Sequence, residues 1–149
     1  MRDLLLVLHI VGVATWLGAN MVQFISTKRL VAHGGQVAAA WTSTTLLWGR
    51  ILYMPAAILV LITGTSLVVD SEGAEFSDAF VSVGFMVIII ATILGIVVVA
   101  KIGRRATNAF AADDNETGNA EINKLILWAA LDTLLVVVAV FAMVGKWGV

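Results

Sequence analysis

The sequence predicts an all-α membrane protein, a four-transmembrane-helix bundle with a short interfacial helix before the second span. Three observations predict this fold. The 149-residue chain is 60% hydrophobic and 13% charged, about half the charged fraction of a soluble domain. Four segments reach the roughly 20 apolar residues that cross about 30 Å of hydrocarbon. The charged residues gather between these segments. One transmembrane domain is therefore expected over residues 1–149, with spans at about 4–25, 51–69, 81–100 and 125–144.

Positive charges predict how the spans are oriented. The loops 26–50 and 101–124 carry seven of the nine Lys and Arg residues, whereas Arg2 and Lys146 lie on the opposite side. Loops rich in Lys and Arg stay in the cytoplasm. Both loops are therefore expected to be cytoplasmic, in the inner membrane of a bacterial-type cell, with both termini outside.

The first span carries a polar stripe. At about 100° per residue, its polar side chains fall on one narrow face beside Gly12: His9, Trp16, Asn20, Gln23 and Thr27. Polar groups in hydrocarbon need partners, so this face is expected to pack against the other spans.

The region before span two is predicted to form the interfacial helix. Gly34 and Gly35 are expected to end a cytoplasmic extension of span one. The segment 36–48 would then lie near the interface, with Trp41 and Trp48 anchored at the headgroups. Pro55 is expected to kink span two.

Several site classes are excluded by composition. The chain has no cysteine, which excludes thiolate metal sites. It also has no basic run with interleaved aromatic residues, so nucleic acid is not an expected partner. The polar segment 113–118 is typical of a solvated linker.

His9 is the first candidate site residue, because neutral imidazole is a common haem and metal ligand. Met86 or Met143 could supply a second ligand to haem, or to copper, which is less well supported. The structural alternatives are a histidine that hydrogen-bonds to a neighbouring helix and methionines that fill the core.

Arg50 and Asp132 form the second candidate constellation, since a carboxylate within a span needs a partner. An Arg50–Asp132 ion pair that closes the cytoplasmic half of the bundle is the favoured interpretation. The alternatives are a proton relay, or an Arg50 anchor for a propionate or a quinone headgroup.

Three stretches together resemble a known family. They are LHIVGVATWLGA in span one, GRILYMPAAILVLITG in span two and LDTLLVVVAVFAMVGKW in span four. This ordered set resembles the HemJ-type protoporphyrinogen oxidases, the CopD-type copper-resistance proteins and predicted integral membrane proteins near them. The resemblance implies a haem- or porphyrin-linked four-helix protein in which His9 matches the first-helix histidine. The third span departs from the HemJ pattern, because it lacks that family's lysine and tyrosine-histidine pair.

The leading functional hypothesis is thus a haem- or porphyrin-associated redox membrane protein that uses His9. A non-catalytic accessory or scaffold subunit is one alternative, and a copper-handling protein of CopD type is another. The expected partners are the lipid bilayer and either another membrane protein or a second copy of the chain.

Overall fold

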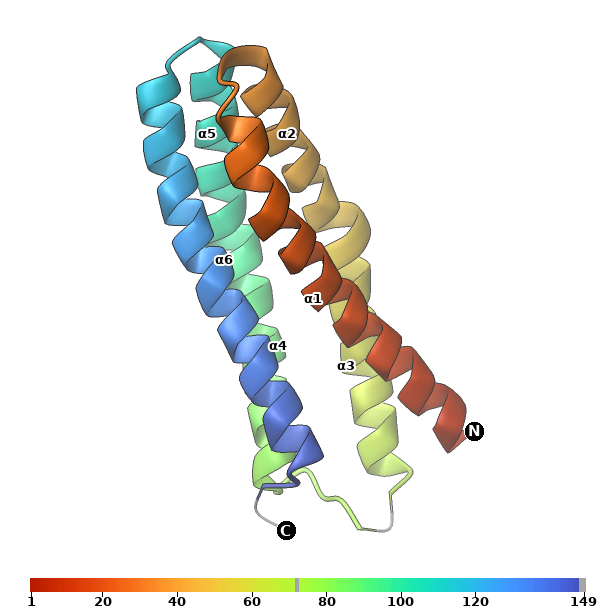
Figure 1. The fold of residues 1–149 in the computed structure, drawn as a ribbon. Coiled ribbons are helices and arrows are strands. Elements are labelled where there is room, and N and C mark those ends of the chain that lie inside the picture. Colours follow the sequence, from red (N-terminus) through yellow and green to blue (C-terminus); the bar gives the residue numbers. More distant parts are fainter. Residues whose placement is uncertain (72, 148–149) are drawn as a thin grey trace.

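The fold consists of four helical rods joined by short connections (Figure 1). The structure is a computed structural model that describes residues 1–71 and 73–147. Two of the rods are interrupted by a π-helical segment (η). The rods are, in order, α1 (Arg2–Val31); α2 (Gly35–Trp48), η1 (Gly49–Tyr53) and α3 (Met54–Val69); α4 (Ala79–Ile93), η2 (Leu94–Val99) and α5 (Ala100–Ala111); and α6 (Asn115–Val144).

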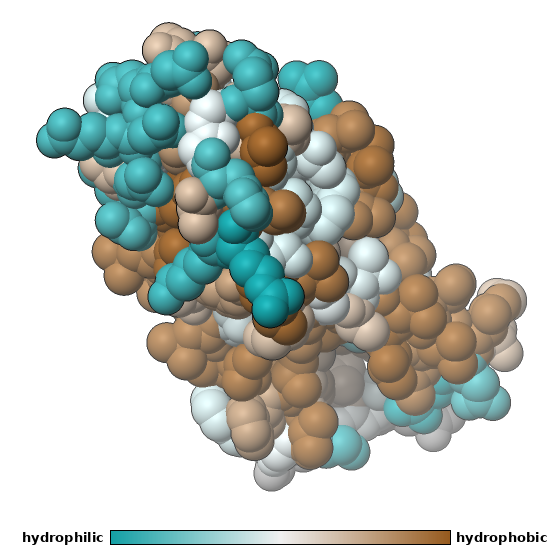
Figure 2. All heavy atoms as spheres, turned by 45° about the horizontal axis from the view of Figure 1, so that its top comes forward, coloured by the Kyte–Doolittle hydropathy of each residue, from teal (hydrophilic) through white to brown (hydrophobic). Residues whose placement is uncertain are grey.

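The predicted four spans are confirmed as four helices that are long and apolar enough to cross a membrane. The start of α1 and the end of α6 lie at one end of the bundle, here called the terminal end, as do the end of α3 and the start of α4 (Figure 1). The opposite end, here called the basic end, holds the α1–α2 and α5–α6 turns. Figure 2 shows hydrophilic residues gathered at the basic end and hydrophobic residues over the adjoining sides.

The helix expected before span two is present and runs into that span. The segment Gly35–Val69 is one continuous rod of 35 residues, in which α2 begins at the basic end and packs along α5 (Figure 1). Trp41 packs inward, because its Nε1 donates a hydrogen bond of 3.1 Å to Thr27 Oγ1. Its ring also meets the ring of Trp48 edge to face at 5.7 Å.

The predicted cytoplasmic loops are mainly helical. At about 1.5 Å per residue a 35-residue rod is about 50 Å long, well beyond the hydrocarbon thickness of about 30 Å. The helices at the basic end bury small and apolar residues against one another, which holds these charged extensions together. This cluster comprises Val31, Ala38, Ala39, Ala106, Phe110 and Ile122. Only short turns separate α1 from α2 and α5 from α6, so segment 113–118 is mostly the start of α6 rather than a linker.

Pro55 stands two residues beyond the last residue of the π-helical segment η1. The proline has no N–H for the Ile51 carbonyl, and in an α-helix its ring would crowd that carbonyl. The rod winds more widely here instead, and Met54 N–H donates to the Gly49 carbonyl in the i→i+5 pattern. The chain therefore passes the proline without ending the helix.

The two turns at the basic end are joined to each other. Gly34 and Gly35 have positive φ angles of 63° and 46°, a region that favours glycine. Gly35 N–H donates to Asn115 Oδ1 at 2.9 Å, and Asp114 caps α6 by accepting from Thr117 N–H at 3.0 Å. The predicted end of the helix after span one is thus confirmed. The turn that follows it is also hydrogen-bonded to the start of α6.

The spans pack as two pairs, α1 with α3 and α4 with α6, and α3 touches α4 only sparsely. The pairs meet in a core nearer the terminal end, made of Trp16, Ala56, Ala57, Val87, Ala91, Val136 and Ala139. The predicted polar stripe faces inward as expected: His9, Trp16, Asn20 and Thr27 are buried, and Gln23 is half-buried.

Candidate functional site

A hydrogen-bonded network joins α1 to α6 in the middle of the bundle. Asp132 Oδ2 accepts from Trp16 Nε1 at 2.9 Å and from Asn20 Nδ2 at 3.0 Å. Asn20 Nδ2 also donates to Thr133 Oγ1 at 2.9 Å. Both polar members of α1 come from the predicted stripe, so the stripe supplies the partners that Asp132 requires in an apolar setting.

The network continues to η1 through the only tyrosine of the chain. Tyr53 Oη donates to Asn20 Oδ1 at 2.5 Å and accepts from Gln23 Nε2 at 2.8 Å. The rings of Tyr53 and Trp16 stand edge to face with centroids 5.6 Å apart. Each hydrogen bond along this path is donated toward Asp132, an arrangement in which neighbouring bonds strengthen one another. We call Trp16, Asn20, Gln23, Tyr53 and Asp132 the Asp132 network.

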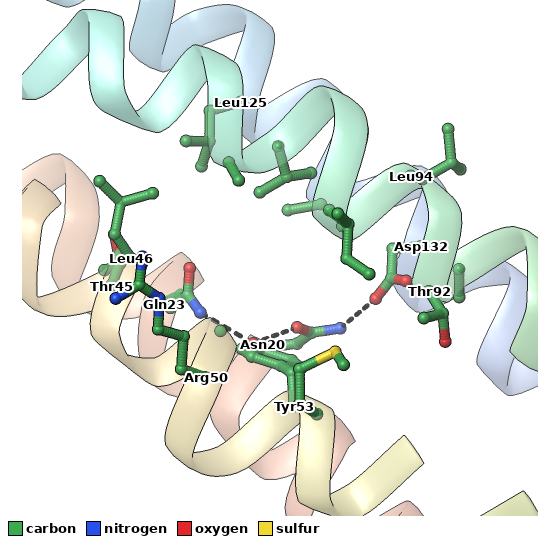
Figure 3. A pocket seen from close by; sticks show the side chains of 18 of the residues that line it. Asn20, Gln23, Thr45, Leu46, Arg50, Tyr53, Thr92, Leu94, Leu125 and Asp132 are labelled. Atoms are coloured by element: carbon green, nitrogen blue, oxygen red, sulfur yellow. Dashed lines mark hydrogen bonds between the residues drawn. The ribbon is translucent and has the colours of Figure 1, made fainter. Parts of the chain in front are cut away.

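The Asp132 network borders a cavity of about 500 Å³ (Figure 3). This volume lies within the roughly 300–1,000 Å³ of pockets that hold small molecules and cofactors. Most of the wall is apolar, with Arg50 and Arg104 toward the basic end, and we call it the arginine cavity. Residues of all four rods line it, including Trp16, Asn20, Gln23, Leu47, Arg50, Tyr53, Met54, Ala57, Ala91, Thr92, Gly95, Ile96, Arg104, Leu125, Ala129 and Asp132.

Both π-helical segments face this cavity. Gly49, Arg50 and Tyr53 of η1 line one wall, and residues of η2 including Gly95 line another. A Cβ placed on Gly49 or on Gly95 would meet no atom within 4 Å. π-Helical turns are frequent at functional sites, so two of them around one cavity mark it independently of its polar residues.

The expected Arg50–Asp132 ion pair is not formed. In the described part of the chain the one ion pair joins Lys124 Nζ to Glu121 Oε1, at 2.7 Å. Arg50 and Asp132 line the same cavity from different sides, and the Arg50 guanidinium extends toward Thr45 rather than toward Asp132 (Figure 3). Trp16 and Asn20 supply the partners of Asp132 instead.

His9 lies closer to the terminal end and is 8% exposed. Its Nδ1 lies 3.0 Å from Thr63 Oγ1, and that hydroxyl donates its single proton to the Leu59 carbonyl at 2.6 Å. Thr63 therefore accepts a hydrogen bond from Nδ1–H, which leaves the Nε2 lone pair of a neutral imidazole free. The contact to a neighbouring helix matches the structural alternative, and the tautomer is also the one that a metal ligand needs.

The two candidate methionines differ in position. Met143 and His9 line the same two small cavities, of about 170 and 50 Å³. The Met143 methyl group sits against Gly84, whose hydrogen leaves room for it. Met86 is 52% exposed on the outer surface of α4 and lines neither cavity. Met143 thus lies beside the same cavities as His9, whereas Met86 lies away from them.

The surroundings of His9 do not enclose a porphyrin. The cavities beside it are smaller than the roughly 300 Å³ at which cofactor pockets begin, and His9 does not line the arginine cavity. Within residues 1–71 and 73–147 no group of three or more His, Asp or Glu side chains could hold a metal ion. A ligand set at His9 would therefore consist of its Nε2 and the Met143 thioether.

Comparison with known proteins leaves the family open: no family model, no curated protein and no solved structure matches this chain.

The sequence did not single out Tyr53, Arg104 and the two π-helical segments as parts of one site. Asn20 and Gln23 are three residues apart on α1, as are Arg50 and Tyr53 on η1, and each pair shares a helix face. These spacings were the available signal. That the two faces meet depends on helix packing, which periodicity within one helix does not reveal.

Proposed function

We propose that the protein is a multi-pass inner-membrane protein that binds a porphyrin, or a closely related amphiphile with carboxylates, in the arginine cavity. The observation that carries the proposal is the cavity itself, about 500 Å³ of mainly apolar space with two arginines at one end. A porphyrin with two propionates has the matching shape and polarity, an apolar ring with anions along one edge.

Arg50 and Arg104 are the groups that would hold the carboxylates. Arginine presents several N–H donors in a planar fork that fits a carboxylate. Both residues lie where seven of the nine cations gather, and this excess favours a cytoplasmic basic end. The carboxylates would then lie at the headgroup level of the inner leaflet, with the ring reaching toward the Asp132 network.

Porphyrin binding is testable by fluorescence titration of the detergent-purified protein with protoporphyrin IX. The double variant Arg50→Gln/Arg104→Gln should weaken binding by about ten- to a hundredfold, the value of charge-assisted hydrogen bonds. Arg105→Gln is the matched control, because Arg105 is an exposed neighbour that does not line the cavity. The dimethyl ester of protoporphyrin should bind as weakly to the native protein as protoporphyrin does to the double variant. Equal affinity for acid and ester would overturn the proposal.

A metal centre at His9 is the second candidate function, favoured by the free Nε2 and by Met143 beside it. A soft thioether with an imidazole suits copper(I). Copper analysis of the purified protein tests this site, with His9→Ala and Met143→Leu as the variants. Met86→Leu is the control, since Met86 faces outward. Bound copper that survives His9→Ala would exclude this site.

If neither porphyrin nor metal binds, the Asp132 network acts only in helix packing. That outcome favours the non-catalytic accessory or scaffold subunit.

A further inference from the structure

The arginine cavity is closed toward the basic end by tight packing between helices. Gly103 of α5 lies against α2 so closely that a Cβ there would be 2.8 Å from Leu46 Cδ2 and 3.7 Å from Leu125 Cδ1. Beyond this contact, Ala106 and Phe110 of α5 are fully buried. A route along the bundle axis from the solvent at the basic end is therefore blocked by packed side chains.

The cavity is also closed toward the terminal end. Trp16, Ala57 and Ala91 line it and at the same time belong to the central core. All three are buried, with exposed fractions of 2–7%. The floor of the cavity is thus the hydrophobic core itself.

The remaining wall faces sideways. Leu47, Met54 and Ile96 line the cavity and are 51%, 37% and 53% exposed. Gly95 beside them is exposed, with open space where its Cβ would be. This wall lies between the rods that contain η1 and η2, where α3 and α4 make few contacts. In a membrane-spanning segment, exposed apolar residues face acyl chains.

We infer that this wall is a lateral portal through which the ligand enters from the surrounding lipid leaflet, not from the aqueous solvent. The inference rests on the proposed function for the identity of the ligand. Arg50 and Arg104 are exposed at the end of the same wall. An anionic amphiphile that is dissolved in the leaflet could therefore keep its carboxylates at the headgroup level while its ring moves sideways into the cavity.

The first test uses the absence of native cysteine to place one nitroxide spin label, at Gly95→Cys, in protein reconstituted in lipid nanodiscs. Electron paramagnetic resonance then compares collisions with oxygen, which dissolves in acyl chains, and with a water-soluble nickel chelate. The label should collide preferentially with oxygen in the ligand-free protein. Gly18→Cys is the control, because Gly18 is exposed on α1 and does not line the cavity. A preference for the nickel chelate at Gly95 would overturn the portal.

The second test adds protoporphyrin IX and follows both collision frequency and binding. Oxygen collisions at Gly95 should fall on binding, and those at Gly18 should not. Binding with no change at Gly95 would overturn the portal while leaving the proposed function intact. Absence of binding would overturn the proposed function, and the ligand-free measurement would still decide the portal.

A blocking variant gives an independent kinetic measurement. Gly95→Phe adds a ring where the backbone faces open space, so it should slow porphyrin association by about tenfold or more without disturbing the packing. Gly18→Phe is matched in chemistry and should associate at the native rate. An unchanged rate in Gly95→Phe would contradict entrance through this wall.

Discussion

Asp132 is the residue on which the inter-helical network ends. Its Oδ2 accepts hydrogen bonds from the Trp16 indole and the Asn20 amide, and both of these side chains are buried. A buried donor that loses its acceptor costs about 1–3 kcal/mol. The carboxylate therefore stabilises the fold through the neutral donors that it satisfies, although no cation of residues 1–71 or 73–147 pairs with it.

Replacement of Asp132 should show this role directly. Asp132→Ala is expected to lower the free energy of unfolding by about 1–3 kcal/mol, measured by denaturation in detergent micelles. Asp132→Asn keeps one acceptor oxygen and should lose less. Combined with Trp16→Phe, the Asp132→Ala effect should shrink, because the indole donor is already absent. Full additivity would mean that the Trp16–Asp132 bond contributes nothing.

Replacement of Arg50, in contrast, should have little effect on the free energy of unfolding. Because Arg50 is exposed and does not pair with Asp132, Arg50→Gln is expected to change the free energy of unfolding by less than about 0.5 kcal/mol. Its effect should add to that of Asp132→Asn in the same assay. A coupling free energy between the two substitutions well above about 0.5 kcal/mol would show that an Arg50–Asp132 ion pair does stabilise the fold.

Among the structural elements, the α1–α2 turn depends on two glycines with positive φ. A Cβ on Gly34 would lie 2.7 Å from Asn115 Oδ1, and left-handed backbone strains other residues by about 1–3 kcal/mol. Gly34→Ala should therefore lower the free energy of unfolding by about that amount. Gly18→Ala is the control, because Gly18 is exposed on α1 and a Cβ there would meet no atom within 4 Å. This substitution should leave the free energy of unfolding unchanged or raise it.

The α6 cap predicts a pH dependence. Hydrogen bonds from the side chain and the backbone N–H of Thr117 hold the pKa of the Asp114 carboxyl below its usual 3.8. A depressed folded-state pKa stabilises the protein above the unfolded-state pKa, and this contribution is lost as the pH falls through the folded-state pKa. Asp114→Ala should thus lower the unfolding temperature at pH 6, and the difference from the native protein should narrow below about pH 4. A constant difference across this range would contradict the cap.

Hydropathy located all four rods but not where they end or how they wind. It marks segments that are compatible with lipid, so the amphipathic helix α5 was taken for loop. The apolar side of α5, which includes Ala106 and Phe110, packs against residues of other helices. Hydropathy along α5 alone does not reveal these contacts. The π-helical turn before Pro55 had a local cause in the sequence, whereas η2 has no proline near it and gives no comparable signal.

For the whole molecule, orientation in the membrane is open to a direct test. Ser77→Cys and Asn108→Cys each place one exposed thiol in an otherwise cysteine-free chain, at the terminal and basic ends. In intact cells with a permeable outer membrane, an impermeant maleimide should label the cysteine at position 77. The cysteine at position 108 should be labelled only after lysis, as expected when the basic end is cytoplasmic. The reverse pattern would invert the topology.

The candidate site could be predicted from sequence only in part. The stripe on α1 identified Asn20 and Gln23, because helical periodicity fixes which residues share a face. The arginine cavity could not be predicted, since its volume arises where two helix pairs diverge and two rods change their winding. His9 was singled out correctly as inward-facing, yet its position away from the arginine cavity follows from depth and packing together.

The two π-helical turns also mark where their rods could lose a residue. A π turn takes up about one residue more per revolution than an α turn, so deleting one residue from η1 or η2 would restore ordinary α winding. The helices before and after the deletion would keep nearly their present faces, whereas a deletion within uninterrupted α-helix rotates everything beyond it by about 100°. The wide turn beside the arginine cavity would be lost, while the packing of the rest of the rod would be kept.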